Sequence, residues 1–155
     1  MNKDNTPELF SVIATHYDFL NHLLSFNFDR SWRQRLVSLS GFQPDSRILD
    51  VCTGTGDIAI EFARRGARDI TGIDLSSGML ARAQQKIEKL NLATRIKLET
   101  GSALNLPYAD KIFDLVTIGF GLRNLPDYAR GISEMARVLK PWGRLFILEF
   151  SLPPD

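Results

Sequence analysis

Two features of the sequence, a glycine-containing run and a single aspartate, have the residue types that can hold a nucleotide-like ligand. The first is the glycine-containing run 50–56, DVCTGTG, which follows a short apolar segment. Glycine lets a backbone turn sharply and approach a ligand closely. The second is Asp74, about twenty residues beyond the loop and at the end of the next apolar segment. A carboxylate there suits a ribose, because it accepts hydrogen bonds from both hydroxyls of the diol.

The residues of this loop fit two cofactors. Gly54, Gly56 and Ala59 satisfy the dinucleotide-binding pattern, so NAD is one of them. S-adenosylmethionine (SAM) is the other, since its sulfonium and ammonium cations suit nearby carboxylates such as Asp50 and Asp57. Asp57 stands where a pyrophosphate would approach the next helix, and a carboxylate there repels phosphate. The residues favour SAM and leave NAD and a plain tight turn open.

The elements that must position these residues alternate along the chain. We expect strands at 47–51, 69–74, 96–100, 113–119 and 144–150, and helices at 31–39, 58–65, 76–90 and 128–139. Alternation of this kind predicts right-handed βαβ units and an α/β Rossmann-like fold, with a mostly parallel five-stranded sheet and helices on both faces. Ligands bind at the carboxyl ends of such strands. Residues 1–43 form a predicted N-terminal helical cap on a cofactor-binding core, 44–155.

Composition narrows the class of protein. The chain has 155 residues, 44% of them hydrophobic, which suits one globular domain, and its formal net charge is +1. This balance gives no electrostatic reason to expect nucleic acid as a partner. The lone Cys52 and the lack of a signal-like N-terminus indicate a cytoplasmic setting. No Cys/His spacing predicts a metal site, and small-residue packing is the simplest role for Cys52.

Three further stretches carry a family resemblance. Residues 17–25, YDFLNHLLS, followed by Arg30-Ser31-Trp32, form the first, and residues 119–124, GFGLRN, form the second. The third runs from 137 to 151, RVLKPWGRLFILEFS. In this order they resemble the signatures of the ubiquinone/menaquinone biosynthesis C-methyltransferase (UbiE type) family. The resemblance extends over nearly the whole chain.

The resemblance implies a class I methyltransferase fold, SAM as methyl donor and carbon methylation of a demethylated polyprenyl quinol, such as demethylmenaquinol or a ubiquinol precursor. It also implies peripheral contact with the inner membrane face through the prenyl tail. By motif, it places these residues at the cofactor: Asp50, Thr53, Gly54, Thr55, Gly56, Asp74, Leu75, Ser102, Ala103 and Gly119. Asp74 would lie at the ribose, and Ser102 and Ala103 beside the adenine. A SAM-binding fragment without activity and a methyltransferase for another small apolar acceptor remain the alternatives.

Methyl transfer to a ring carbon needs an acceptor for the hydroquinone proton and a cation near the resulting oxyanion. We expect Arg123 to be that cation and Asn124 to orient the phenol or a water, both on the strength of the second signature. A surface ion pair is the plainer role for Arg123. Tyr17, His16 and His22 belong to the predicted cap. Phenylalanines of the first segment either line a tail channel or pack in the core: Phe10, Phe19, Phe26 and Phe28.

The sequence departs from the family pattern in several places. Asp29 replaces a usual histidine, Trp142 a usual glycine, Ser102 a frequent Asp or Asn, and Gly119 a frequent serine. The chain also stops after the fifth expected strand, where family members continue. An apolar edge strand invites pairing. We therefore expect a truncated or split enzyme, or one completed by a second copy or a partner chain.

Overall fold

The computed structural model describes residues 28–150. Five strands form one sheet: β1 (Arg47–Val51), β2 (Asp69–Asp74), β3 (Ile96–Thr100), β4 (Phe113–Gly119) and β5 (Leu139–Leu148). The helical elements are α2 (Phe28–Ser40), α3 (Asp57–Arg64), α4 (Ser77–Lys89), the short 3₁₀ helix η2 (Leu122–Asn124) and α5 (Tyr128–Val138). Predictions that concern the side chains of His16, Tyr17, His22 and the early phenylalanines lie outside the described residues.

The sheet has the order β3-β2-β1-β4-β5, and every neighbouring pair of strands is parallel. The chain builds outward from β1 to β3 and then returns to place β4 on the other side of β1. The switch point therefore lies between β1 and β4, and the crevice beyond the carboxyl ends of these two strands is where ligands bind in such sheets.

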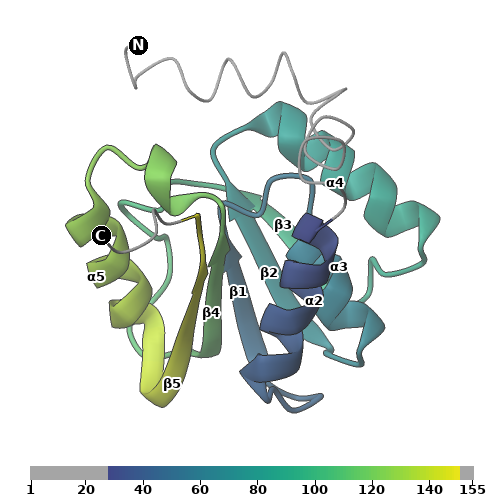
Figure 1. Ribbon diagram of the computed structural model, residues 1–155, viewed down its shortest axis with the longest axis horizontal. Helices are drawn as coiled ribbons and strands as arrows, with labels where there is room; N and C mark the ends of the chain where they lie inside the picture. Colours follow the sequence, from purple (N-terminus) through teal and green to yellow (C-terminus); the bar gives the residue numbers. More distant parts are fainter. Residues whose placement is uncertain (1–27, 151–155) are drawn as a thin grey trace.

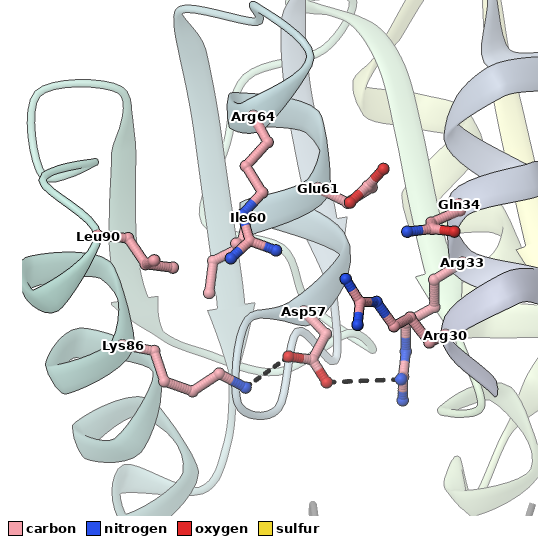
Figure 2. Close-up of a pocket in the computed structure, with 9 residues that line it drawn as sticks. All are labelled: Arg30, Arg33, Gln34, Asp57, Ile60, Glu61, Arg64, Lys86 and Leu90. Carbon is pink, nitrogen blue, oxygen red and sulfur yellow. Dashed lines mark hydrogen bonds and ion pairs between the residues drawn. The ribbon is translucent and has the colours of Figure 1, made fainter. Parts of the chain in front are cut away.

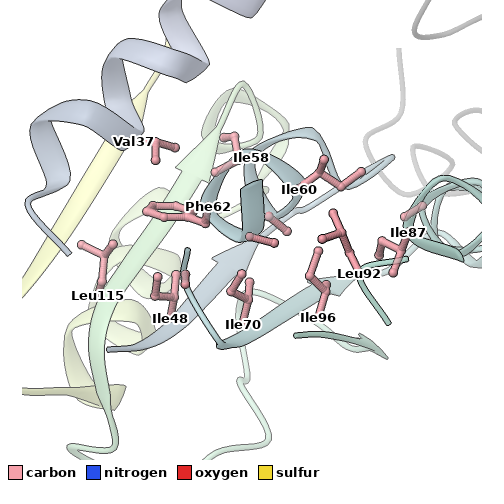
Figure 3. Packing of buried hydrophobic residues seen from close by; sticks show 14 of the residues in the cluster. Val37, Ile48, Ile58, Ile60, Phe62, Ile70, Ile87, Leu92, Ile96 and Leu115 are labelled. Atoms are coloured by element: carbon pink, nitrogen blue, oxygen red, sulfur yellow. The ribbon is translucent and has the colours of Figure 1, made fainter. Parts of the chain in front are cut away.

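Helices cover both faces of the sheet, with α2, α3 and α4 on one side and α5 on the other (Figure 1). One buried cluster joins α2, α3 and α4 to the first face of the strands and includes Val37, Phe62 and Ile87 (Figure 3). A second cluster joins α5 and the segment before β4 to the opposite face, around Val116 and Met135. Strands that are buried on both faces are mostly apolar, and β1 and β4 are buried along most of their length.

The predicted α/β class, the parallel sheet and the five strands are confirmed, with helix bounds within three residues of those predicted. Ser76 caps α4, its hydroxyl accepting from the Met79 N–H at 3.3 Å. The part of the predicted cap that the structure describes, α2, packs into the first cluster of the core through Leu36 and Val37.

The fifth strand starts earlier than expected. The backbone becomes extended at Leu139, so α5 ends at Val138 and β5 follows without a loop. Phe113 pairs with Leu139 and Leu115 pairs with Arg144, so the intervening residues form a bulge, with Trp142 at φ 68°. The strand is predicted to start at residue 144, and the Pro-Trp-Gly run before that residue is instead a bulge inside the strand.

Candidate functional site

The glycine loop follows β1, and three of its residues have left-handed backbone conformations. Cys52, Gly54 and Gly56 have φ of 53°, 56° and 82°. The Thr53 N–H donates to the Ile73 carbonyl at 3.1 Å, which ties the loop to the end of β2. Within the described residues, no atom lies within 4 Å of where a Cβ on Gly54 would stand. The backbone at Gly54 therefore faces open space, as close approach of a ligand requires.

Asp74 links the glycine loop to the start of α4. Its Oδ2 accepts from the Gly54 N–H and its Oδ1 from the Ser76 N–H, both at 2.9 Å. Burial raises the pKa of this carboxyl, and the backbone donors act in the opposite direction. Each carboxylate oxygen has two acceptor positions, so the group can receive a ribose diol while it holds the loop. Leu75 follows it with 52% of its surface exposed, an apolar platform beside the predicted ribose position.

Asp50 lies beneath the loop, with only 1% of its surface exposed. The Thr53 hydroxyl donates to its Oδ2 at 2.6 Å, and the Thr117 hydroxyl of β4 donates to its Oδ1 at 2.7 Å. Burial raises the pKa of Asp50 to about 6, although the two hydroxyl donors lower it. In this structure Asp50 supports the loop from below and presents no surface of its own to a ligand.

Asp57 is not an isolated negative charge, because two cations lie next to its carboxylate. Lys86 of α4 donates to its Oδ1 and also to the Thr55 hydroxyl, the latter at 3.1 Å, and Arg33 lies 3.5 Å from its Oδ2. Figure 2 shows these cations on either side of Asp57, in a pocket of about 370 Å³ between α2, α3 and α4. Two cations therefore neutralise the Asp57 carboxylate, and the prediction that this carboxylate repels a pyrophosphate is wrong.

The loop after β3 adjoins Asp74. The Gly101 N–H donates to the Asp74 carbonyl at 3.0 Å. Ser102 is half-buried, and its hydroxyl accepts from the Leu104 N–H at 3.1 Å. Ala103 is buried in the second core cluster, with 5% of its surface exposed. Of the two residues expected beside an adenine, Ser102 keeps accessible surface, whereas the Ala103 side chain packs inward.

The segment after β4 meets the glycine loop across the switch point. A Cβ on Gly121 would stand 2.6 Å from the Cβ of Cys52, so the two loops pack closely only because residue 121 is glycine. Phe120, like Cys52 across the switch point, is a non-glycine residue in the left-handed region, with φ 56°. Such strain collects where the surrounding structure fixes a functional geometry. At the end of β4, a Cβ on Gly119 would stand 2.4 Å from Ile58 Cδ1.

Arg123 stands in η2, beside the segment after β4, with 45% of its side chain exposed. Its guanidinium forms an ion pair with Glu149, which follows β5, and lies 5.4 Å from the centroid of the Phe150 ring. Asn124 Nδ2 donates weakly to the Phe120 carbonyl at 3.5 Å. The structure thus brings the two predicted catalytic residues to the carboxyl edge, with Arg123 already paired to a carboxylate.

Sequence reasoning missed Glu149 and an aromatic cluster at the same edge. Phe120 stacks on Phe150 with ring centroids 5.0 Å apart, and Trp32 of α2 lies 5.6 Å from the Phe150 ring. No local signal identifies these partners, because α2, the β4 loop and the end of β5 meet only in the folded chain. The cluster forms an apolar surface beside Arg123.

The described residues offer no metal site, no reactive thiol and no membrane-spanning helix. Residues 28–150 hold no group of three His, Cys, Asp or Glu side chains placed to bind a metal. Burial and the neighbouring carboxylates of Asp74 and Asp50 raise the pKa of the Cys52 thiol, and this part of the chain has no histidine to deprotonate it. None of the described helices is long and apolar enough to span a membrane.

Comparisons with known proteins agree with this geometry. The model of the ubiE/COQ5 methyltransferase family matches residues 1–154. The chain is 49% identical over 152 residues to the ubiquinone/menaquinone biosynthesis C-methyltransferase UbiE of Geotalea daltonii, an alignment that covers 97% of this chain and 65% of that protein. It is 44% identical over 151 residues to the demethylmenaquinone methyltransferase of Lactiplantibacillus plantarum, covering 96% of this chain and 64% of that one.

A solved structure shares the fold. A Methanococcus maripaludis protein described as a SAM-dependent methyltransferase matches with a TM-score of 0.79 at 24% identity, over 88% of this chain and 62% of that chain. This likeness establishes the Rossmann-like class I methyltransferase fold. The chain spans less than two thirds of the length of the curated relatives described above.

Proposed function

This chain belongs to the ubiE/COQ5 methyltransferase family, and on that premise we propose that it binds SAM and transfers the methyl group to a ring carbon of a demethylated polyprenyl quinol. The relatives' names supply the substrate class, demethylmenaquinol or a ubiquinol precursor. One observation carries the proposal: Asp74 holds the glycine loop at Gly54, and Cys52 of that loop packs against Gly121, in the segment after β4 that leads into Arg123 and Asn124.

The residues at the edge fit SAM. When bound, SAM supplies an electrophilic methyl group on a sulfonium. We assign the ribose hydroxyls to Asp74 and the adenine to the exposed Leu75 and the half-buried Ser102. The backbone at Gly54 then faces the sulfonium end, over the crevice between β1 and β4. Because Asp57 is neutralised by Lys86 and Arg33, the case for SAM over NAD rests on the family and not on this carboxylate.

The acceptor lies on the β4 side of the crevice in this proposal. A hydroquinone ring stacks against the surface formed by Phe120, Phe150 and Trp32, since offset and edge contacts between aromatic rings are favourable. Arg123 stabilises the phenolate that forms when a ring hydroxyl gives up its proton to water. Holding acceptor and donor in line supplies roughly 7–11 kcal/mol of the barrier.

The polyprenyl tail of such an acceptor partitions into a lipid bilayer. The proposed site of action is therefore the cytoplasmic membrane surface, which the protein contacts peripherally through its substrate. β5 has a strand neighbour on one side only within residues 28–150, so its outer edge is the proposed place for a further strand, from a second copy or a partner chain. Light scattering that gave a monomer mass over a wide concentration range would count against that assembly.

The test is transfer of a labelled methyl group from SAM to reduced demethylmenaquinone by this 155-residue chain. Methylated product, absent when oxidised quinone replaces the quinol, supports the proposal. SAM binding without product, over a panel of quinols, would instead identify a chain that binds the cofactor and does not turn over alone. Methylation of another small apolar acceptor in preference to the quinols would correct the substrate class.

A further inference from the structure

Arg33 of α2 lies at the carboxyl edge, although no motif of the sequence singled it out. Only 13% of its side chain is exposed, and its Nη1 stands 3.5 Å from Asp57 Oδ2 at the start of α3. Its Cζ lies 5.6 Å from the centroid of the Phe120 ring, after β4. Its positive charge also lowers the pKa of Asp50 at the end of β1. The approaches to Asp57 and to the Phe120 ring place the guanidinium between the glycine loop and the segment after β4.

The strand order indicates which part of a bound SAM would lie near the Arg33 guanidinium. Asp74, the proposed ribose ligand, follows β2, and the next strands along the edge are β1 and β4. A ligand that is anchored at β2 and presents its methyl group toward Arg123 must lay its methionine part over the β1 loop. That part ends in an ammonium and a carboxylate.

The carboxylate needs a cation, because the carboxylate of Asp74 at the same edge would repel it. Lys86 belongs to α4 and points at Thr55 and Asp57 from the side of the loop that faces α4. Arg123 is paired with Glu149, which follows β5, on the side of β4 away from β1 and the glycine loop. Arg33 is the cation held at the β1–β4 junction, where ring contact with Phe120 and the ion pair with Asp57 orient it. A guanidinium presents its N–H donors as a planar fork that matches a carboxylate.

We propose that Arg33 binds the carboxylate of the methionine part of SAM and makes the site selective for ligands that carry this amino-acid group. The inference rests on the proposed function, because it takes SAM as the ligand and Asp74 as its ribose anchor.

The experiment compares two ligands that differ only at this end. S-adenosylhomocysteine carries the amino-acid group, whereas 5′-methylthioadenosine has the same adenosine and thioether without it. Affinities of both are measured by calorimetry for the unchanged chain, for Arg33→Gln and for Arg33→Lys. Arg30→Gln is the matched control, since Arg30 lies one turn earlier on α2, is exposed and lines the same pocket. Circular dichroism and thermal unfolding verify that each variant folds.

We expect Arg33→Gln to weaken S-adenosylhomocysteine about 10- to 100-fold, the range for loss of a hydrogen-bonded charge partner, and to change methylthioadenosine by less than about twofold. Arg33→Lys retains part of the affinity, and Arg30→Gln alters neither ligand. If Arg33→Gln weakens both ligands equally, or neither, the assignment of the carboxylate is overturned while SAM binding stands. If the unchanged chain binds neither ligand, the proposed function is overturned and this inference with it.

Discussion

Asp50 should make the stability of the chain depend on pH. Its pKa is about 6 in the folded chain against an ordinary value of 3.8, because burial disfavours the charged form. Between these two values the folded chain holds more protons than the unfolded chain, so the free energy of unfolding falls as pH rises. The difference in pKa corresponds to about 3 kcal/mol. This contribution is fully present below pH 3.8 and is lost once the pH has risen past about 6.

Urea denaturation between pH 4 and pH 7 tests this, with Asp50→Asn as the perturbation. The amide cannot titrate, and it keeps an oxygen that accepts from Thr53 or Thr117. The unchanged chain should lose about 2 kcal/mol relative to Asp50→Asn over this range, because part of the loss has already occurred at pH 4, whatever the constant offset between them. Asp45→Asn, which replaces an exposed carboxyl, is the control. If the difference in free energy of unfolding between the two chains is flat with pH, or shifts in favour of the unchanged chain as pH rises, the raised pKa of Asp50 is contradicted.

Three further predictions concern the edge of the sheet. Asp74→Ala should weaken SAM binding by about tenfold or more in calorimetry, because it removes the ribose acceptor and the partner of two backbone N–H groups; unchanged affinity would end the ribose assignment. Gly121→Ala should lower the free energy of unfolding by about 1–3 kcal/mol, since its Cβ would stand 2.6 Å from the Cβ of Cys52, which the backbone fixes, and an unchanged urea midpoint would contradict this. Arg123→Gln should leave SAM affinity within about twofold and lower methyl transfer. A loss of SAM affinity would instead move Arg123 from the acceptor side of the crevice to the cofactor.

The sequence was sufficient for the parallel sheet and for the edge at which the loops after β1 and β2 meet, because both depend on local signals. Apolar runs bounded by Gly54 and Asp74 mark where β1 and β2 end, and the alternation of strands and helices then fixes which ends meet. The start of β5 could not be found this way. Pro141 and Gly143 are turn residues by type, and only their pairing beside Phe113 makes the run a bulge within a strand.

The electrostatic partners were also beyond sequence reasoning. Asp57 looks like a free carboxylate at a helix start, whereas Lys86 and Arg33 reach it from two other helices. Glu149 pairs with Arg123 across 26 positions of sequence. These contacts depend on how α2, α4 and the end of β5 pack, and no spacing in the sequence records that packing.

Calorimetric titration of this chain with SAM and, separately, with NAD tests most directly whether the glycine loop and Asp74 bind a methyl donor. We expect one SAM per chain, displaced by S-adenosylhomocysteine, and no NAD binding at the same concentrations. Binding of NAD in preference to SAM, or no binding of SAM by a folded sample, would contradict the assignment of the glycine loop and Asp74 to a methyl-donor site.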